Sequence, residues 1–480
     1  MTKILLAFFF LTFTIQSFGQ QFSQYNTGTL YDSFENNAQR SFIPDSSRQY
    51  ASNFFLPNFY LNFNLSGNAQ VPLKSRAFNG NYVKNNLRIG NGNFTNQTNT
   101  DINYYLFMFK AYTNLAGDAE IGISAQTRFE MRGIFTDESV AIFNGPSALP
   151  QNHYDNIFNN SGTYQAYHQL SFTYREKINK RFALGAKLSL LMGIRYQNVD
   201  IRESHIDIDR PNDLAVLSMR GKYLLNYIPG GFTTHDYIPN LRNPGAAISI
   251  GSTVRTNDNF NLQFNLKDLG FIHWSSRSYT YNFDRSDTIK QFSSAAREKN
   301  IYNAAKSITK NNVTTGSFVT PTNSKFEISA NKVFWLDYDN QLKYSPTLIV
   351  SKELFFKGLA AALVNPVSYN NYTLTLTTSY NNYKTLSVGG QFMFKTPNVE
   401  FFVGSEKLFQ TTSLAFASTG SSSQINDKSS YTGASLFLGA AFKFGHLIEH
   451  PLNASSIPNE NNPGFLKRLY LKIFRRNEGY

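Results

Sequence analysis

The chain has 480 residues, a formal net charge of +13 and no cysteine. The lack of cysteine excludes disulfides, thiolate metal sites and a lipidated N-terminal cysteine. Aromatic residues make up 15% of the sequence, yet the mean hydropathy is only −0.34. An aromatic-rich but moderately polar chain is typical of a membrane β-barrel, because only half of each strand faces lipid.

The N-terminus has the organisation of a secretory signal peptide. Met1–Lys3 is a short basic start, Ile4–Ile15 is one apolar run, and Ser17 and Gly19 are the small residues that a signal peptidase reads. We predict that residues 1–19 are removed; a buried N-terminal helix is the alternative. The apolar run is too short for a permanent membrane anchor. For an exported protein the basic charge favours outer-membrane lipid and lipopolysaccharide as partners, and not nucleic acid.

Residues 20–53 lack the regular alternation of the segments that follow. We predict that they fold into the lumen of the barrel as a plug or hatch, since barrel lumens are often closed in this way. An exposed tail is the alternative.

From residue 54 onward the chain alternates between apolar and polar residues. In Asp118–Gly133 one face is apolar and the other carries charges of both signs. Alternation over about nine to eleven residues is the signature of a transmembrane strand. Clear copies occur at 58–66, 163–175, 259–267, 372–380 and 435–445, and weaker ones at 102–110, 182–197, 214–225, 247–255, 325–333, 342–351, 358–364, 386–395, 399–407 and 412–417.

This pattern predicts an all-β fold, a transmembrane antiparallel β-barrel of about 14 strands over residues 54–445. Short connections alternate with long polar ones, as expected for periplasmic turns and outer loops. A soluble sandwich or propeller is the alternative, but soluble strands average only about five to six residues. We therefore expect the protein in the outer membrane.

The polar face of the strand at Asp118–Gly133 provides the candidate functional residues. Glu120, Arg128, Glu130 and Arg132 are predicted to line the lumen, because charges on the lipid face cost a few kcal/mol each. They are candidates for a permeation path. The alternative is a set of ion pairs that only stabilise the wall.

Two long polar segments are predicted to be loops. Asn198–Asp213 contains Asp207, Asp209 and Asp213, whose oxygens suit calcium, although the spacing is not that of an EF-hand and a solvated loop is the alternative. The second, Ser275–Asn323, includes a helix-compatible stretch at 295–309, and loops of that length are usually functional or mobile.

Residues 446–480 are predicted to form a periplasmic basic tail. After Pro463-Gly464, apolar residues from Phe465 to Ile473 recur at helical spacing, and basic residues occupy the rest of the surface. This indicates an amphipathic helix on the inner leaflet. A partner-docking helix and a disordered tail are the alternatives. The basic residues are Lys467, Arg468, Lys472, Arg475 and Arg476.

No catalytic, metal or cofactor motif is present. The seven histidines show no metal-ligand spacing such as HExxH, and neither a nucleophile elbow nor a phosphate-binding glycine loop occurs. His168 lies on an apolar strand face and Ser171 on the opposite one, so they are not a hydrolase pair; His168 is predicted to be an interfacial aromatic. We predict that the protein is not an enzyme and binds no metal or cofactor.

The segment "NLKDLGFIHW" (Asn265–Trp274), with Asp268, Gly270 and Trp274, resembles a motif of an uncharacterised family of Bacteroidota outer-membrane barrels. The segments "QQFSQYNTGTLYDSFENNAQRSF" and "NVEFFVGSEKL" add to the resemblance. It implies a barrel similar to the long-chain fatty-acid transporters, with about fourteen strands and an N-terminal lumen hatch, and more loosely similar to type IX secretion barrels. Gly270 suits a bulge or turn, and Trp274 suits an interfacial girdle.

Three functions remain open. The first is a channel or transporter for a small, possibly hydrophobic, molecule. The second is a non-catalytic accessory or anchor of a type IX secretion or gliding machinery, with secretion-machinery proteins as partners. The third is a barrel lipid hydrolase, which no catalytic motif in the sequence supports.

Overall fold

In the computed structural model, the described residues are 21–83, 86–113, 118–227, 234–356, 358–381, 385–420, 422–425, 431–449 and 464–474. The predicted signal peptide, residues 1–19, lies outside them. Among the described residues, no helix is long and apolar enough to cross a membrane.

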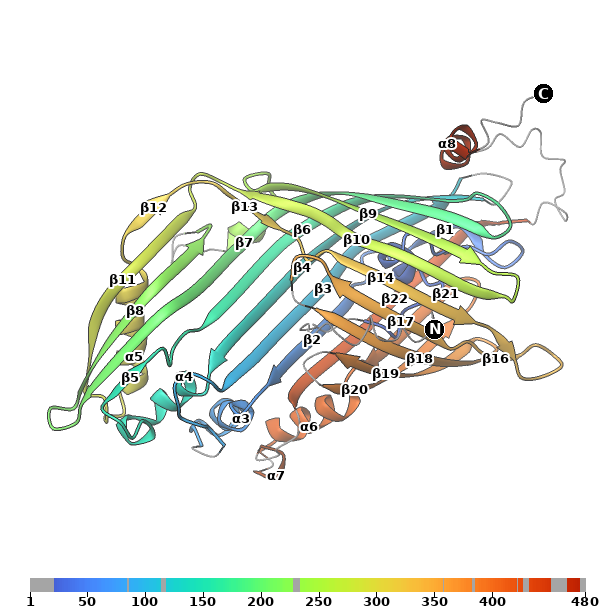
Figure 1. The fold of residues 1–480 in the computed structure, drawn as a ribbon. Helices are drawn as coiled ribbons and strands as arrows, with labels where there is room; N and C mark the ends of the chain where they lie inside the picture. Colours follow the sequence, from blue (N-terminus) through green and yellow to red (C-terminus); the bar gives the residue numbers. More distant parts are fainter. Residues whose placement is uncertain are drawn as a thin grey trace, which may run out of the picture.

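A closed antiparallel barrel of 14 strands forms the body of the molecule (Figure 1), which confirms the predicted fold class. Each strand pairs with its neighbours along the chain, and the last strand pairs with the first through Phe59 and Leu438. The wall strands are β2 (Asn58–Ser66), β3 (Thr95–Tyr112), β4 (Ala119–Thr136), β6 (Ser161–Lys177), β7 (Phe182–Asp209), β9 (Pro244–Arg255), β10 (Phe260–Trp274), β14 (Lys325–Lys332), β17 (Thr347–Glu353), β18 (Leu359–Tyr369), β19 (Tyr372–Asn381), β20 (Leu386–Lys395), β21 (Val399–Ser405) and β22 (Tyr431–Leu447).

The two faces of the wall have opposite polarity. Along β19, Leu374 and Leu376 are exposed on the outside, whereas Thr373, Thr375 and Thr377 are buried on the inside. A wall that presents apolar side chains outward and buries polar ones is stable only when lipid surrounds it. The fold is therefore that of an outer-membrane β-barrel.

The first wall strand is interrupted. β1 (Arg48–Ser52) has the same two neighbours as β2, namely β3 and β22, and residues 53–57 bulge out between them. Phe54 and Phe55 adopt left-handed backbone angles, φ 46° and 64°, and are exposed. The Asn53 side chain replaces the missing ladder bonds: its Oδ1 accepts the Met108 N–H at 2.7 Å, and its Nδ2 donates to the Leu106 carbonyl at 3.1 Å. The wall thus begins at Arg48, within the segment expected to precede it.

The two ends of the barrel differ. At the end that we call the turn end, strands connect through short segments such as 178–181, 256–259, 370–371 and 396–398, and through the hairpin of β15 (Phe334–Trp335) and β16 (Leu342–Tyr344). The opposite end, the loop end, carries long connections with their own elements. These are α3 (Gln70–Asn79), α4 (Glu138–Ala141), η1 (Ile142–Asn144), η2 (Pro146–Ala148), η3 (Thr234–Tyr237), β13 (Phe318–Pro321), α6 (Leu408–Ser418) and α7 (Ser422–Ile425).

A sheet extends beyond the barrel at the loop end (Figure 1, left). We call it the overhang: the far part of β7, with β5 (His153–Asp155), β8 (Leu214–Leu225), β11 (Tyr279–Lys290), β12 (Val313–Thr315) and α5 (Arg297–Thr309). One side packs an apolar core that includes Ile206, Leu217, Phe283 and Ile301.

The overhang corrects two predictions. Residues 198–209 are not a loop, because β7 continues to Asp209 and pairs with β8 there; only 210–213 form a turn between the two strands. The segment 275–323 contains strand β11 in addition to the expected helix, which the structure places at Arg297–Thr309. Both segments are rich in polar residues because one face of the overhang meets water.

The weak strand expected at 412–417 is also wrong, since these residues belong to α6. β21 ends at Ser405, and α6 then lies beside the unpaired part of β22: the Ser435 N–H donates to the Thr411 hydroxyl at 3.0 Å. A run of only six residues does not distinguish a strand from an apolar helix turn.

Candidate functional site

The N-terminal segment fills the turn-end half of the lumen. We call residues 21–47 the hatch; it contains the helix α2 (Leu30–Glu35). The Thr29 hydroxyl caps this helix by accepting the Asp32 N–H at 3.2 Å. Leu30, Tyr31 and Phe34 are buried against wall residues from β2, β3, β20, β21 and β22.

Wall cations hold the hatch through its backbone carbonyls. Lys110 donates to Ser33 at 3.1 Å, Arg175 to Ala38 at 2.8 Å, Lys395 to Gly28 at 2.6 Å and Lys443 to Ser41 at 2.9 Å. Each of these bonds joins residues far apart in the chain, so the hatch is tied to the wall around its circumference.

Wall carboxylates accept hatch N–H groups in turn. Glu406 accepts from Ser23 at 2.8 Å, Glu400 from Leu30 at 2.8 Å and Glu120 from Ser41 at 3.1 Å. Side-chain bonds add Ser23 to Thr377, with the hydroxyl oxygens 2.8 Å apart, and Gln24 to Gln391 at 2.7 Å.

A glycine in the wall allows close contact with the hatch. A Cβ atom at Gly185 would lie only 1.9 Å from the carbonyl oxygen of Asn37. A larger residue there would force the hatch away from the wall. The hatch therefore packs against backbone as well as side chains.

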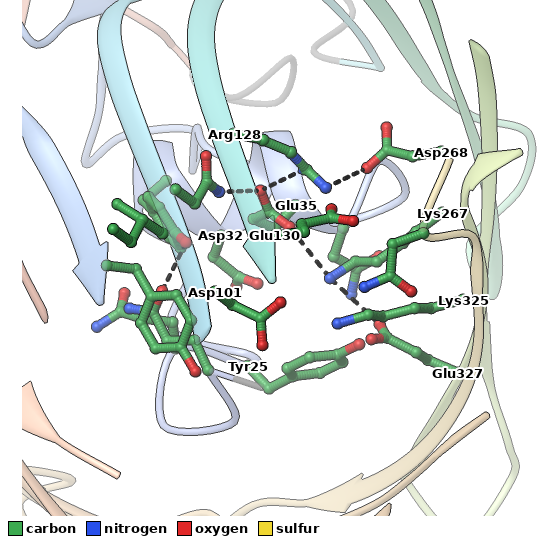
Figure 2. A pocket seen from close by; sticks show the side chains of 18 of the residues that line it. Tyr25, Asp32, Glu35, Asp101, Arg128, Glu130, Lys267, Asp268, Lys325 and Glu327 are labelled. Carbon is green, nitrogen blue, oxygen red and sulfur yellow. Dashed lines mark hydrogen bonds and ion pairs between the residues drawn. The ribbon is translucent and has the colours of Figure 1, made fainter. Parts of the chain in front are cut away.

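A small cavity adjoins the hatch (Figure 2). Its volume is about 80 Å³, enough for a few water molecules or a small chemical group. Three tyrosines give it aromatic surface: Tyr25, Tyr31 and Tyr60. Its charged lining consists of six acidic residues, Asp32, Glu35, Asp101, Glu130, Asp268 and Glu327, and three basic ones, Arg128, Lys267 and Lys325.

A continuous ion network crosses this cavity (Figure 2). Arg128 bridges Asp268 at 2.8 Å and Glu35 at 3.3 Å. Lys267 bridges Glu35 at 3.2 Å and Glu327 at 3.3 Å. The network joins the hatch, which supplies Glu35, to strands β4, β10 and β14.

The pKa values of two buried hatch carboxyls, Asp32 and Glu35, are shifted in opposite directions. Burial alone would raise the pKa of Glu35, but Lys267 and Arg128 outweigh it and lower this pKa to about 2. Burial raises the pKa of Asp32 to about 7, opposed by the Gly28 N–H and by Lys395. Glu35 is therefore ionised in the network, whereas burial favours the protonated form of Asp32.

A β-bulge in β10 builds half of the network. The pairing of β10 with β9 shifts between Leu266 and Leu269, and Asp268 has a left-handed φ of 47°. The extra residue lets two consecutive side chains, Lys267 and Asp268, both face the lumen. The hydroxyls of Thr322 and Ser324 donate to the Asp268 carbonyl at 2.5 and 2.9 Å, which satisfies the displaced backbone.

The same bulge explains the motif around Asp268. Beyond it the strand parity is reversed, so Trp274 faces inward, fully buried, and its Nε1 donates to Thr320 at 2.8 Å. The expected place in an interfacial girdle is wrong for this reason. Gly270 lies against β9, where a Cβ would be 2.3 Å from the Ala246 carbonyl oxygen.

The structure brings together some of the four predicted lumen residues. Arg128 and Glu130 line the cavity. Glu120 lies nearer the turn end, between Lys110 at 3.7 Å and Arg175 at 3.6 Å, and its carboxylate accepts the Ser41 N–H of the hatch. Arg132 pairs with Glu353 at 3.2 Å. Their role in permeation stays a prediction.

Four members of the network were not predicted as lumen residues: Glu35, Lys267, Asp268 and Glu327. For Lys267 and Asp268 the signal was a charged pair, "KD", in an otherwise alternating strand. Such a pair breaks the period of two and marks a bulge. Nothing in the local sequence identifies Glu35, because its partners come from distant strands.

The C-terminal helix α8 (Phe465–Phe474) contacts the turn end of β6. The Leu466 N–H donates to the Glu176 carboxylate at 2.8 Å, and the Phe465 and Leu469 side chains are exposed. Of the predicted tail residues, Lys467, Arg468 and Lys472 lie in α8, and Arg475 and Arg476 lie outside the described residues. Binding of α8 to a membrane surface stays a prediction.

The predicted calcium ligands do not converge. Asp207 lies beside His153, Asp209 accepts the Asn212 amide at 2.7 Å, and the Asp213 carboxylate accepts the Ser293 N–H at 2.7 Å. These carboxylates point to three different partners, so they do not form the six- to eight-oxygen cage that calcium takes.

His168 and Ser171 lie on opposite faces of β6. His168 Nε2 is 2.7 Å from the Tyr237 carbonyl oxygen and its Nδ1 is 2.8 Å from the Thr127 hydroxyl. Ser171 faces the lumen, where its hydroxyl lies 2.9 Å from that of Ser189.

Fold and site together define an outer-membrane β-barrel with a hatch and a charged lumen. A protein-family model described as a family of unknown function (DUF5723) matches residues 42–406. The chain therefore belongs to this family. No curated protein sequence matches it.

Several solved structures match most of this chain at low sequence identity. A FadL homologue of Pseudomonas aeruginosa is 11% identical, with a TM-score of 0.41 over 88% of this chain and 96% of that one. The toluene transporter TbuX of Ralstonia pickettii is 9% identical, with a TM-score of 0.41 over 87% and 94%. The toluene transporter TodX of Pseudomonas putida is 7% identical, with a TM-score of 0.38 over 86% and 93%. At these scores the likeness does not bear on the substrate.

Proposed function

We propose that this protein is a gated channel for a small molecule in the outer membrane. The predicted signal peptide would direct its export to that membrane. The observation that carries the proposal is the hatch. It is held inside the barrel by hydrogen bonds and ion pairs to many strands, and a charged cavity lies beside it. The polar contacts among these can be exchanged for water when the hatch moves, at lower cost than contacts within an apolar core.

The lining of the cavity favours a solute with an aromatic or aliphatic body and a positive group. The tyrosines supply surface for the body, and the six acidic residues outnumber the three basic ones. An excess of carboxylates in a confined space concentrates cations. This refines the expected small, possibly hydrophobic, molecule into an amphipathic one.

A disulfide between hatch and wall tests the gate directly. The hydroxyl oxygens of Ser23 and Thr377 are 2.8 Å apart, so cysteines at both positions have their sulfur atoms close to bonding distance. The natural chain has no cysteine to interfere. The matched control is Ser171→Cys with Ser189→Cys, a pair at 2.9 Å that links two wall strands without touching the hatch.

The measurement is swelling of proteoliposomes in benzylammonium and in benzoate, with and without dithiothreitol. We expect oxidation of the Ser23→Cys/Thr377→Cys variant to stop benzylammonium entry, and reduction to restore it. In every form that admits solute, benzoate should enter more slowly than benzylammonium. Equal entry in the oxidised and reduced forms would show that the hatch does not gate the lumen.

A docking or anchoring role is the second candidate. It is favoured by the overhang, which extends beyond the barrel wall at the loop end, and by the exposed Phe465 and Leu469 of α8. An accessory role in type IX secretion or gliding, with machinery proteins as partners, remains the specific form of this candidate. Deletion of 464–474 with normal secretion and assembly would argue against it.

A further inference from the structure

Two strands of the overhang carry the same tripeptide pattern, histidine, apolar residue, aspartate. They are His153-Tyr154-Asp155 in β5 and His205-Ile206-Asp207 in β7. The strands are antiparallel, and their register places His153 opposite Asp207 and Asp155 opposite His205. The central residues, Tyr154 and Ile206, are buried in the overhang core.

Because side chains alternate along a strand, burial of the central pair directs the other four to the opposite, solvent-exposed face. Two cross-strand pairs, one beside the other, thus consist entirely of metal-ligand residue types. The backbone of the sheet fixes their positions, and the buried pair anchors them.

The four side chains form a closed circuit of contacts. His153 Nδ1 lies 2.6 Å from Asp207, and its Nε2 lies 3.3 Å from Asp155. His205 contacts Asp155 through Nδ1 and lies 3.7 Å from Asp207 through Nε2. The two imidazole rings meet edge to face, with centroids 4.5 Å apart.

We propose that His153, Asp155, His205 and Asp207 bind a divalent transition-metal ion of the Zn²⁺ class. Ligand atoms of His153, His205 and Asp207 already lie within 4.8 Å of one another. Around tetrahedral zinc, with Zn–N bonds of 2.0–2.1 Å, ligand atoms are about 3.3 Å apart. The side chains are 40–60% exposed, so small rotamer changes bring them to that distance.

The donor set selects the kind of ion. Two imidazole nitrogens and two carboxylates suit zinc and its neighbours in the first transition row. Calcium takes six to eight oxygen ligands and has no use for imidazole. The prediction of no metal site from the sequence relied on short helical motifs and did not consider ligands paired across two strands.

The bound ion would fasten the β4–β6 connection to the overhang. β5 has only three residues, and it belongs to the segment 137–160, whose Ile142, Leu149 and Ile157 also pack into the overhang core. A metal that binds only the folded form stabilises it by mass action. This inference is independent of the proposed channel function.

The test is calorimetric titration of the full mature chain in detergent with Zn²⁺ alone, without a polyhistidine tag. We expect one zinc per chain in the native protein. His153→Ala and His205→Ala should each weaken binding by about tenfold or more, since single changes around metal sites cost at least that much. His446→Ala, which alters an exposed histidine at the other end of the barrel, should bind as the native protein does.

A second variant separates a metal site from a plain cluster of ion pairs. His153→Lys with His205→Lys keeps positive charges beside Asp155 and Asp207 but offers no imidazole. We expect it to fold, as judged by unboiled gel mobility, and to lose zinc binding. Zinc should also slow hydrogen exchange in 137–160 of the native protein only. Absence of zinc binding in the native chain, or equal affinity in the lysine variant, would overturn the proposal.

Discussion

Strand β7 passes through two regions whose polarity is opposite. In the barrel wall, Leu188 and Leu190 point outward and are 59% and 42% exposed, while Lys187 is buried inside. In the overhang, the same strand buries Ile206 and Ile208 at 0% and 5% exposure and presents His205, Asp207 and Asp209 to the outside. One continuous strand therefore has a polar interior at one end and an apolar interior at the other.

The difference shows what the surroundings of each region must be. Burying charge in the lumen is tolerable where the charge meets an opposite partner, as Arg128 does with Asp268. Exposing leucine is favourable only in contact with lipid. In the overhang the apolar core and charged surface are those of a water-soluble sheet. The boundary of the membrane along β7 lies between these two patterns.

The largest expected effect comes from breaking the lumen network. Arg128→Ala leaves Asp268 and Glu35 without one of their cationic partners in a buried site and should lower the free energy of unfolding by about 3–5 kcal/mol. Urea titration in lipid vesicles, followed by unboiled gel mobility, measures it. Arg128→Lys, which keeps the positive charge, should lower the free energy of unfolding by less. An unchanged midpoint for Arg128→Ala would mean that the network does not stabilise the barrel.

A matched pair of surface substitutions tests where the membrane lies. Leu188→Arg puts a charge on the lipid side of β7 and should cost about 2–4 kcal/mol if the site is near the midplane. Val216→Arg makes the same kind of change on the exposed face of the overhang, where we expect less than about 0.5 kcal/mol. The same urea titration compares them. Equal costs at the two sites would contradict the assignment of lipid and water to these regions.

The smallest expected effect is a pH dependence of the hatch. The pKa of Asp32 is raised by burial to about 7, above its unfolded value, so its contribution to docking is full in acid and is lost as pH rises through about 7. Glu406, which accepts the Ser23 N–H, follows the same direction, because burial raises its pKa to about 7. Glu35, with its pKa near 2, changes docking only in strong acid.

We therefore expect the hatch to open more readily at pH 8 than at pH 5.5. Single-channel recordings in planar bilayers should show a higher open probability at pH 8. Asp32→Asn should reduce this difference, and Asp32→Asn with Glu406→Gln should remove most of it. A higher open probability at pH 5.5 than at pH 8 would be a pH dependence of the opposite sign. It would exclude these two carboxyls as the cause of that dependence.

The alternation of apolar and polar residues predicted much of the fold. The period of two in segments such as 163–175 and 372–380 predicted wall strands, and the structure has β6 and β19 there. The apolar–polar alternation of β4 also placed Glu120, Arg128, Glu130 and Arg132 on one face. The strand predictions are confirmed because alternation is a local property that each strand expresses alone.

Local alternation misled where the surroundings changed or the period broke. Residues 198–213 look like a loop by composition, but residues 198–209 continue β7 into water, where polar residues face outward. Trp274 was placed on the wrong side because a bulge at Lys267-Asp268 reverses the parity of β10. The sequence of a segment does not determine whether lipid or water surrounds it, nor its register with a neighbouring strand.

By itself, the sequence determined that this chain forms a large antiparallel barrel with a polar lumen and that an irregular segment precedes its wall. Only the tertiary structure decided that this segment is inserted as a hatch, that Glu35 meets Arg128 and Lys267, and that His153 and His205 face each other 4.5 Å apart. The physical reason is range. Strand formation depends on neighbours two residues apart, whereas these sites depend on which distant strands close the barrel around them.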